Sequence, residues 1–197
     1  MTRIPSHTIE DAPEASRPLL QNVIQFSPTG RLLNLHAQLA HSPAVLAAYT
    51  SIRQANDAHG TLEFPVRAAL MLATAGATHS EYAEAITATL AERAGWSTQQ
   101  IGALRDGGSL GDDKIDSIVG VVREAAAHQG RVGDLAWERA VACGWTDEQL
   151  TEAFSYLALT VFTGYFLNYA RTAPDLPAAG AAGPQASGAG AAAGGQV

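Results

Sequence analysis

Apolar residues recur every three to four positions along most of the chain, which is the period of an amphipathic helix. No segment shows the strict alternation that is typical of a strand. Residues that favour the start or the end of a helix flank the apolar stretches. Ser42 before Pro43 is an example of a start, and Gly60 is an example of an end. The pattern predicts helices over about 11–25, 43–59, 65–74, 78–95, 112–128 and 134–143, with two more starting near 97 and 146. We therefore expect one all-α domain of about eight helices.

Three capping-box patterns mark predicted helix starts. In this motif a Ser or Thr side chain accepts a hydrogen bond from the backbone three residues on, where a Glu or Gln reaches back. The pairs are Thr78 with Glu81, Ser97 with Gln100, and Thr146 with Gln149. Near the N-terminus, Pro18 is expected to bend or shorten the first helix.

Two segments near the end of the chain differ from the rest. Residues 153–170 are uncharged and long enough to raise the question of a membrane span. Because they include Ser155, Thr160 and Asn168, we interpret them as a buried helix instead. From Pro177 the sequence is PAAGAAGPQASGAGAAAGGQV, which is too poor in large apolar residues to form a core. The predicted organisation is a helical domain over 1–177 and a flexible tail over 178–197.

Composition narrows the possible functions. The chain has 197 residues, a net charge of −7 and a single lysine, Lys114, so no basic face for nucleic acid is visible. The lone Cys143 excludes an intramolecular disulfide, and no His, Cys, Asp or Glu spacing resembles a zinc site. The N-terminal residues lack an apolar signal core. We expect a cytoplasmic protein without metal or other cofactor, without a membrane or nucleic-acid partner. The Ala, Gly and Arg richness hints at a bacterial source.

Residues 67–95, reading RAALMLATAGATHSEYAEAITATLAERAG, resemble the core motif of the alkylhydroperoxidase-D-like and carboxymuconolactone decarboxylase family. That family usually carries Arg-Glu, then Cys-x-x-Cys, then a histidine four residues on. The matching positions here are Arg67-Ala68, Ser80 with Ala83, and Thr87. The fragments AHSP at 40–43, AERAGWSTQQI at 91–101 and FTGYFLN at 162–168 resemble further family segments in the same order.

The resemblance implies an all-helical domain that forms trimers, hexamers or related homo-oligomers, with a site at the start of the motif helix near a subunit interface. In peroxidase-like members the glutamate and histidine relay protons while the cysteine pair reduces a peroxide. An alcohol such as Ser80 cannot replace a redox thiol, because it forms neither a sulfenate nor a disulfide. Asn168 stands where a histidine is usual. Alkyl hydroperoxide reduction by the family mechanism is therefore the least favoured function.

The motif helix still carries groups that can move protons. His79, Glu84 and Tyr82 are the catalytic candidates, since an imidazole titrates near neutrality and a carboxylate can act as a base. Ser80, Glu84 and Thr87 fall at i, i+4 and i+7 and share one face. Each also has a plainer interpretation: a solvated first-turn histidine, an exposed polar face and a packed tyrosine. The remaining ligand-binding candidates are Ser80, Thr87, His36, Tyr165 and Asn168.

Two hypotheses from different classes follow. The first is a repurposed lyase- or isomerase-type enzyme that performs non-redox acid–base chemistry, such as decarboxylation, elimination, rearrangement or cyclisation, on a small organic molecule. Secondary metabolism is a plausible setting for it. The alternative is a catalytically inactive oligomeric binding or structural protein. Titratable groups that converge on a cavity would favour the enzyme, and a purely apolar cavity would favour the binding protein.

Overall fold

The computed structural model describes residues 1–27 and 30–176. This part holds nine α-helices, a short 3-10 turn and no strand, so the all-α prediction is confirmed with nine α-helices in place of about eight. The elements are η1 (Glu14–Ser16), α1 (Arg17–Phe26), α2 (Asn34–Leu39), α3 (Pro43–His59), α4 (Phe64–Ala77), α5 (Glu81–Arg93), α6 (Thr98–Asp106), α7 (Asp113–Ala127), α8 (Asp134–Ala142) and α9 (Asp147–Ala170). The predicted tail lies outside the described residues.

Two of the three predicted capping boxes are present, at the starts of α6 and α9. The third prediction, that Thr78 begins the motif helix, is wrong. The Thr78 hydroxyl donates to the Thr74 and Ala75 carbonyls and so belongs to the last turn of α4. His79 then adopts a left-handed φ of 51°, which turns the chain, and Ser80 becomes the N-cap of α5.

The first predicted helix also begins later than expected. A 3-10 turn takes residues 14–16, and α1 starts at Arg17. Pro18 therefore sits in the first turn of α1, where a missing N–H costs nothing, and the helix is shorter than the predicted 11–25, as the prediction that Pro18 bends or shortens it allowed.

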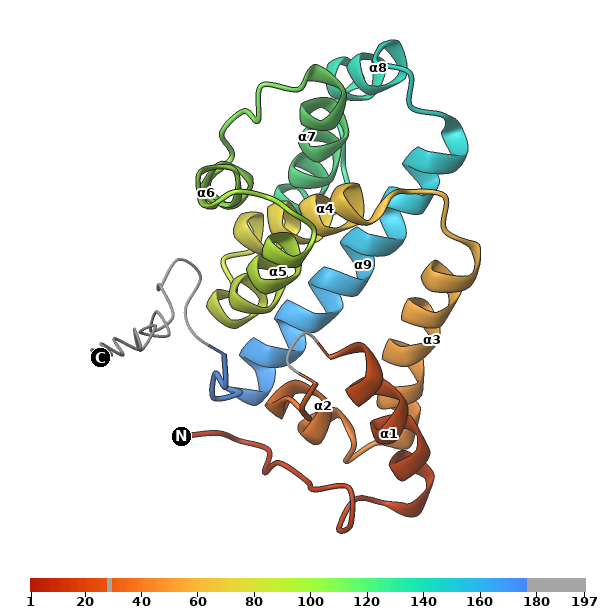
Figure 1. The fold of residues 1–197 in the computed structure, drawn as a ribbon, viewed down its shortest axis with the longest axis vertical. Helices are drawn as coiled ribbons and strands as arrows, with labels where there is room; N and C mark the ends of the chain where they lie inside the picture. The colour runs from red at the N-terminus through yellow and green to blue at the C-terminus, as the bar shows by residue number, and fades with distance from the viewer. Residues whose placement is uncertain (28–29, 177–197) are drawn as a thin grey trace, which may run out of the picture.

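Helix α9 forms the axis of the molecule and runs along most of its length (Figure 1). It packs against α2, α3, α4, α5 and α7. Within the described part it is the one helix long and apolar enough to cross a membrane, yet half of its apolar window is buried inside the protein. This burial fits the prediction of a core helix.

Two apolar clusters meet along α4, α5 and α9. One lies among α4, α6 and α7, with Leu70, Leu104 and Ile118 fully buried. The other fills the space between α1, α2, α3 and α5, with Leu20 and Leu46 at its centre. Figure 1 shows α6, α7 and α8 at one end of α9 and α1, α2 and α3 at the other. The candidate site lies between these ends.

Candidate functional site

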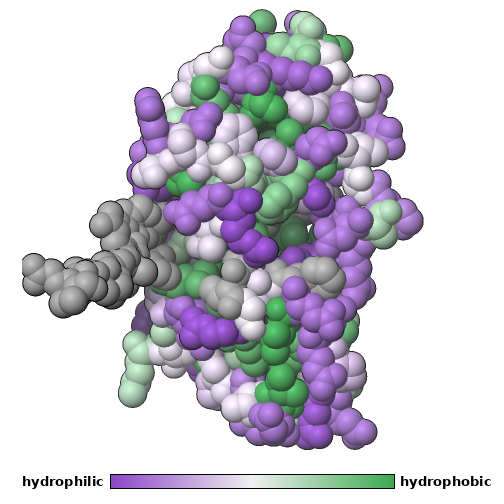
Figure 2. Space-filling view, in the orientation of Figure 1, coloured by the Kyte–Doolittle hydropathy of each residue, from purple (hydrophilic) through white to green (hydrophobic). Residues whose placement is uncertain are grey.

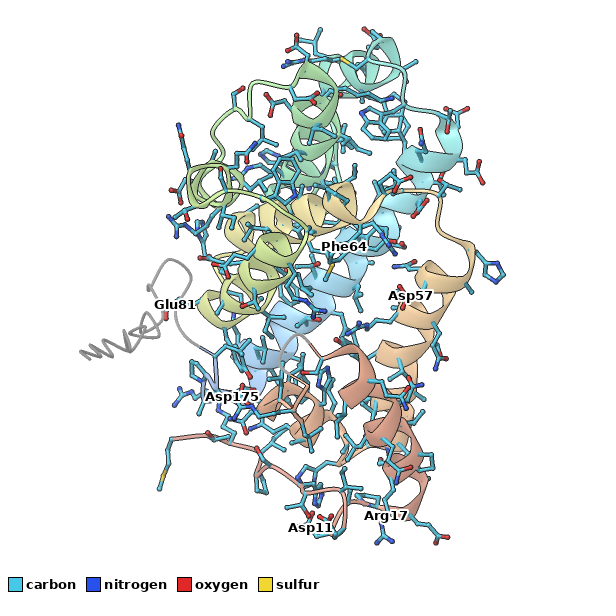
Figure 3. The ribbon with its side chains drawn as sticks, viewed as in Figure 1. Asp11, Arg17, Asp57, Phe64, Glu81 and Asp175 are labelled. Atoms are coloured by element: carbon cyan, nitrogen blue, oxygen red, sulfur yellow. The ribbon has the colours of Figure 1, made fainter. Side chains whose placement is uncertain are left out.

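A cavity of about 270 Å³ lies where α3, α4, α5 and α9 approach one another. Figure 2 shows a hollow on this face that is bordered by hydrophilic side chains, and Figure 3 shows Phe64 and Asp57 on either side of the space between α4 and α3. Each helix lines the cavity with residues spaced by three or four, so one face of each helix builds the wall. These residues are Tyr49, Arg53, Asn56 and Asp57 on α3; Phe64, Arg67, Ala68 and Met71 on α4; Ala83, Ile86, Thr87, Leu90 and Arg93 on α5; and Tyr156, Leu159, Thr160 and Thr163 on α9.

The positions matched to the family motif converge on this cavity. Arg67, Ala68, Ala83 and Thr87 all line it, although 20 positions of chain separate the first from the last. The places that the family motif gives to the glutamate, the second cysteine and the histidine therefore carry two alanines and a threonine. Thr87 donates its hydroxyl to the Ala83 carbonyl at 2.8 Å, as is usual for a threonine inside a helix.

One polar cluster in the cavity wall joins His36, Tyr49 and Arg53. The Tyr49 hydroxyl lies 3.3 Å from His36 Nε2 and accepts a hydrogen bond from Arg53 Nη1 at 3.4 Å. Burial, with the positive charge of Arg53 adding to it, lowers the pKa of His36 to about 3. The imidazole is therefore neutral at physiological pH, and its Nε2 accepts from the Tyr49 hydroxyl or donates to it according to the tautomer. Its Nδ1 atom has no hydrogen-bond partner.

A second polar cluster contains Asn56, Asp57, Arg67 and Tyr156. Asn56 accepts from the Ser155 hydroxyl through Oδ1 at 2.7 Å, while its Nδ2 has no partner. Arg67 Nη1 lies 3.5 Å from Asp57 Oδ1, and the guanidinium carbon is 5.7 Å from the centre of the Phe64 ring. Arg67 Nε is buried and also lacks a partner.

The Tyr156 hydroxyl completes this second cluster and stays protonated. Burial raises its pKa to about 12, against the opposing effect of Arg67. Tyr156 donates to Glu152 Oε1 at 3.3 Å, and the same carboxylate accepts from the Thr61 and Leu62 backbone. Glu152 thereby ties the α3–α4 connection to α9 and holds Tyr156 in the cavity wall.

Buried polar atoms without partners concentrate at this cavity. Among the residues that the structure describes, four buried side-chain atoms lack a hydrogen bond: His36 Nδ1, Asn56 Nδ2, Arg67 Nε and Ser80 Oγ. The first three belong to cavity-lining residues. Since buried polar groups are nearly always satisfied, these atoms indicate a site that a ligand or water molecules complete.

Of the eight residues predicted from the sequence, His36 and Thr87 line the cavity. Ser80 is buried beside it, against α9: a Cβ added to Gly164 would lie 3.2 Å from Ser80 Cβ. Tyr165 and Asn168 are exposed on α9 and face away from the cavity.

The three proton-handling candidates do not line the cavity. His79 is exposed in the α4–α5 turn. Glu84 is half-buried and lies within reach of the charges of Arg105 and Asp106 on α6, and burial raises its pKa against the opposing charges of Arg105 and His79. Tyr82 is buried and donates its hydroxyl to Asp175, which fastens the segment after α9 to α5. The proposed stripe of Ser80, Glu84 and Thr87 is thus divided between the helix start, the α6 side and the cavity.

Several cavity residues escaped the sequence prediction, namely Tyr49, Arg53, Asn56, Arg67 and Tyr156. A signal for them exists on α3, where Tyr49, Arg53 and Asn56 are spaced i, i+4 and i+7. Across residues 1–27 and 30–176, no three His, Cys, Asp or Glu side chains gather closely enough to hold a metal ion.

The sequence matches no protein-family model and no curated protein. Solved structures resemble it strongly in shape. An uncharacterised peroxidase-related protein from Ralstonia eutropha, described as an alkylhydroperoxidase AhpD core, superimposes with a TM-score of 0.77 over 88% of this chain and 92% of its own. The chain has the alkylhydroperoxidase-D-like fold.

Two other structures of this fold extend the comparison. The debrominase Bmp8 gives a TM-score of 0.74 at 13% identity, covering 89% of this chain and 93% of its own. A cysteine-to-alanine variant of Bmp8 in complex with 2,3,4-tribromopyrrole gives 0.69, covering 88% and 91%. The identity to the Ralstonia eutropha protein is 16%, so these matches speak to the alkylhydroperoxidase-D-like fold alone.

Proposed function

We propose that this protein performs non-redox acid–base chemistry on a small organic molecule bound in the cavity between α3, α4, α5 and α9. The observation that carries the proposal is the composition of the cavity wall. The positions matched to the redox motif hold Ala68, Ala83 and Thr87, whereas His36, Tyr49 and Arg53 supply a hydrogen-bonded polar set. The cavity wall has no cysteine for thiol chemistry, and it has the Tyr49 hydroxyl for proton transfer.

Tyr49 is the residue best placed to move a proton. Its hydroxyl can donate to a bound molecule, and the guanidinium of Arg53 at 3.4 Å stabilises the phenolate that remains. His36 is neutral because of its depressed pKa, so in the tautomer that carries the proton on Nε2 it donates to the Tyr49 oxygen, which leaves the Tyr49 proton for the ligand and Nδ1 as an acceptor. A proton given by Tyr49 to a carbanion or enolate suits decarboxylation, isomerisation or rearrangement, and Tyr49 regains the proton from water.

The fold neighbours support a small-molecule function. A Bmp8 structure with the same fold holds a brominated pyrrole, a ring of the size that this cavity would accept. The present chain has its single cysteine at Cys143, distant in sequence from the motif positions. We therefore carry over the class of ligand, a small organic molecule, and leave out the debromination chemistry.

The test is turnover by the purified protein. Small unsaturated carboxylic acids and lactones are incubated with it, and products are followed by mass spectrometry. We expect Tyr49→Phe to lower turnover of an accepted substrate by about 100-fold or more, as loss of a general acid does. Tyr165→Phe removes the hydroxyl of an exposed residue of α9 outside the cavity and is the matched control. Organic hydroperoxide reduction with a dithiol should be absent, and robust peroxidase activity that survives Cys143→Ser would contradict this proposal.

A catalytically inactive binding protein is the second candidate. It is favoured by the location of His79, Glu84 and Tyr82 outside the cavity wall. Saturable ligand binding with no chemical change in any compound of the panel would select it.

We also propose that the protein is a homo-oligomer, a trimer or hexamer, in the cytoplasm. Phe154, Tyr165 and Tyr169 are large, exposed and placed along one helix, α9, as subunit-contact residues would be. Light scattering on the purified chain measures the assembly directly, and a monomer at all concentrations would refute it.

A further inference from the structure

We propose that the ligand of this cavity is an organic carboxylate with an apolar body, and that Arg67 and Asn56 hold its carboxylate group. The inference rests on the proposed function for the location of the site, and it adds the chemical class and the orientation of the bound molecule.

The first argument is charge. The cavity is lined by three arginines, Arg53, Arg67 and Arg93, and by one carboxylate, that of Asp57. The chain as a whole carries a net charge of −7. A positive wall in an acidic protein attracts an anion to this place and disfavours a cation.

The second argument is the hydrogen-bonding capacity that remains. Arg67 uses Nη1 toward Asp57 and acts on the Tyr156 hydroxyl, while its Nε atom is buried without a partner. Asn56 uses its acceptor Oδ1 toward Ser155, which leaves the donor Nδ2. Both orphan atoms are donors, and Asn56 is 9% exposed. The ligand group that satisfies them must consist of acceptors, and a carboxylate supplies two such oxygens at the spacing that a guanidinium edge prefers.

The two residues belong to one cluster. Asn56 precedes Asp57 on α3, and Asp57 is the carboxylate that Arg67 contacts at 3.5 Å. Ser155, which binds Asn56, precedes Tyr156 on α9, and the charge of Arg67 acts on Tyr156. The donors from α3 and α4 therefore meet beside the same turn of α9.

The other residues of the cavity wall indicate the polarity and size of the rest of the ligand. Met71, Ile86 and Leu159 line the cavity between the helices, with Leu33 at the N-cap of α2 and Leu35 in its first turn. These side chains offer no hydrogen bonds, so the body that they contact is apolar. A volume of about 270 Å³ lies just below the usual range for ligand pockets and suits one or two rings or a short alkyl chain. With the carboxylate at Arg67, the body extends toward Tyr49, which places the reactive carbon near the proposed acid.

Isothermal titration calorimetry tests the proposal with three matched pairs of probes: hexanoate and hexanamide, benzoate and benzamide, and 2-naphthoate and 2-naphthamide. Each pair has the same body and differs in the charge of the head group. We expect at least one carboxylate to bind saturably, about tenfold or more tighter than its amide, and more weakly as salt is added. Equal affinity within every pair, or no binding of any carboxylate, would overturn the proposal with the unmodified protein alone.

Variants then locate the carboxylate. Asn56→Asp keeps the acceptor for Ser155 and replaces the free donor by a negative oxygen, so carboxylate binding should fall about tenfold or more. Arg67→Gln should abolish the preference for carboxylate over amide. Arg131→Gln removes the same charge from an exposed residue outside the cavity and should change neither affinity. Carboxylate binding that is unchanged in both cavity variants, with folding verified by circular dichroism, would refute the assignment.

The proposed function and this inference fail in distinguishable ways. Turnover of neutral lactones without any carboxylate preference would sink the anion proposal and keep the enzyme. Tight carboxylate binding without turnover would keep the anion proposal and select the binding protein.

Discussion

Two half-buried arginines, Arg123 and Arg67, lie at different places along α4 and differ in their hydrogen bonds. Arg123 on α7 points Nη1 at three backbone carbonyls, those of Ala73, Leu104 and Arg105, at 3.3, 2.8 and 3.1 Å. Arg67 lines the cavity, touches Asp57 through a single atom and leaves Nε buried without a partner. The sequence presents both as arginines on amphipathic helices. Their hydrogen bonds distinguish Arg123, which joins helices, from Arg67, which keeps a free donor for a ligand.

The surroundings of Arg123 and Arg67 also differ in how closely they are packed and in how many polar atoms lack partners. At the junction of α4, α6 and α7 the backbones come so close that a Cβ on Gly76 would lie 2.2 Å from the Arg105 carbonyl oxygen. The carbonyls there are satisfied by Arg123, and the packing leaves no room for a ligand. The cavity wall instead holds three buried polar atoms without partners, one each from α2, α3 and α4. Natural proteins tolerate such a local departure where function requires it.

The sharpest test of this comparison replaces both arginines by methionine. Arg123→Met removes the donor for three carbonyls at the end of α6 and inside α4, so we expect a loss of about 2–3 kcal/mol of unfolding free energy. Arg67→Met removes a partly exposed ion pair with Asp57, the contacts of the guanidinium with Phe64 and Tyr156, and an unsatisfied donor, so a change within about 1 kcal/mol is expected. Urea unfolding of both variants measures the difference. Equal losses would mean that Arg67 is also a structural residue.

Features of the fold that depend only on residues close together in the sequence were predictable. The capping boxes at Ser97 and Thr146 need only a side chain and a backbone N–H three residues away, and both are present. The failure at Thr78 has a tertiary cause. The α4 helix continues to Ala77 in the buried centre of the molecule, which places Thr78 in its final turn. The identical local pattern therefore ends one helix instead of starting the next.

The site was less predictable because it is assembled from distant segments. Thr87 was predicted through the motif and His36 as a ligand-binding candidate, and both line the cavity. Nothing local couples Tyr49 to His36 or Ser155 to Asn56, which are 13 and 99 positions apart. In the same way, Tyr82 binds Asp175 across 93 positions, a pairing that favours a structural role over the predicted catalytic one. Such contacts follow from helix packing and are absent from a periodic pattern.

The second prediction concerns pH and uses the buried histidine of the cavity. Burial holds the pKa of His36 at about 3, against 6.5 for an ordinary histidine. Below pH 6.5 the unfolded chain binds a proton that the folded chain refuses, so stability falls as pH decreases from about 6.5 toward 3. The slope from this residue approaches about 1.4 kcal/mol per pH unit.

His36→Gln removes this titration and keeps a polar side chain. The difference in unfolding free energy between the parent and this variant should change with pH between 6.5 and 4, and stay constant above pH 7.5. Urea unfolding across that range provides the measurement. A constant difference at every pH would show that His36 titrates normally in the folded protein, and the neutral hydrogen-bond partner of Tyr49 would be lost from the proposed chemistry.

The smallest effect is expected for Ser80→Ala. This change tests whether an unpartnered polar atom outside the cavity wall behaves differently from those in the wall. Ser80 Oγ is buried without a partner, makes no cap hydrogen bond to α5 and belongs to no cavity-lining residue. Ser80→Ala should therefore leave stability unchanged or raise it by about 0.5–1 kcal/mol, since an unsatisfied buried hydroxyl is removed. Benzoate affinity should not change, in contrast to Asn56→Asp. If Ser80→Ala weakened benzoate as much as Asn56→Asp does, the ligand would reach the start of α5, and the site would coincide with the motif serine after all.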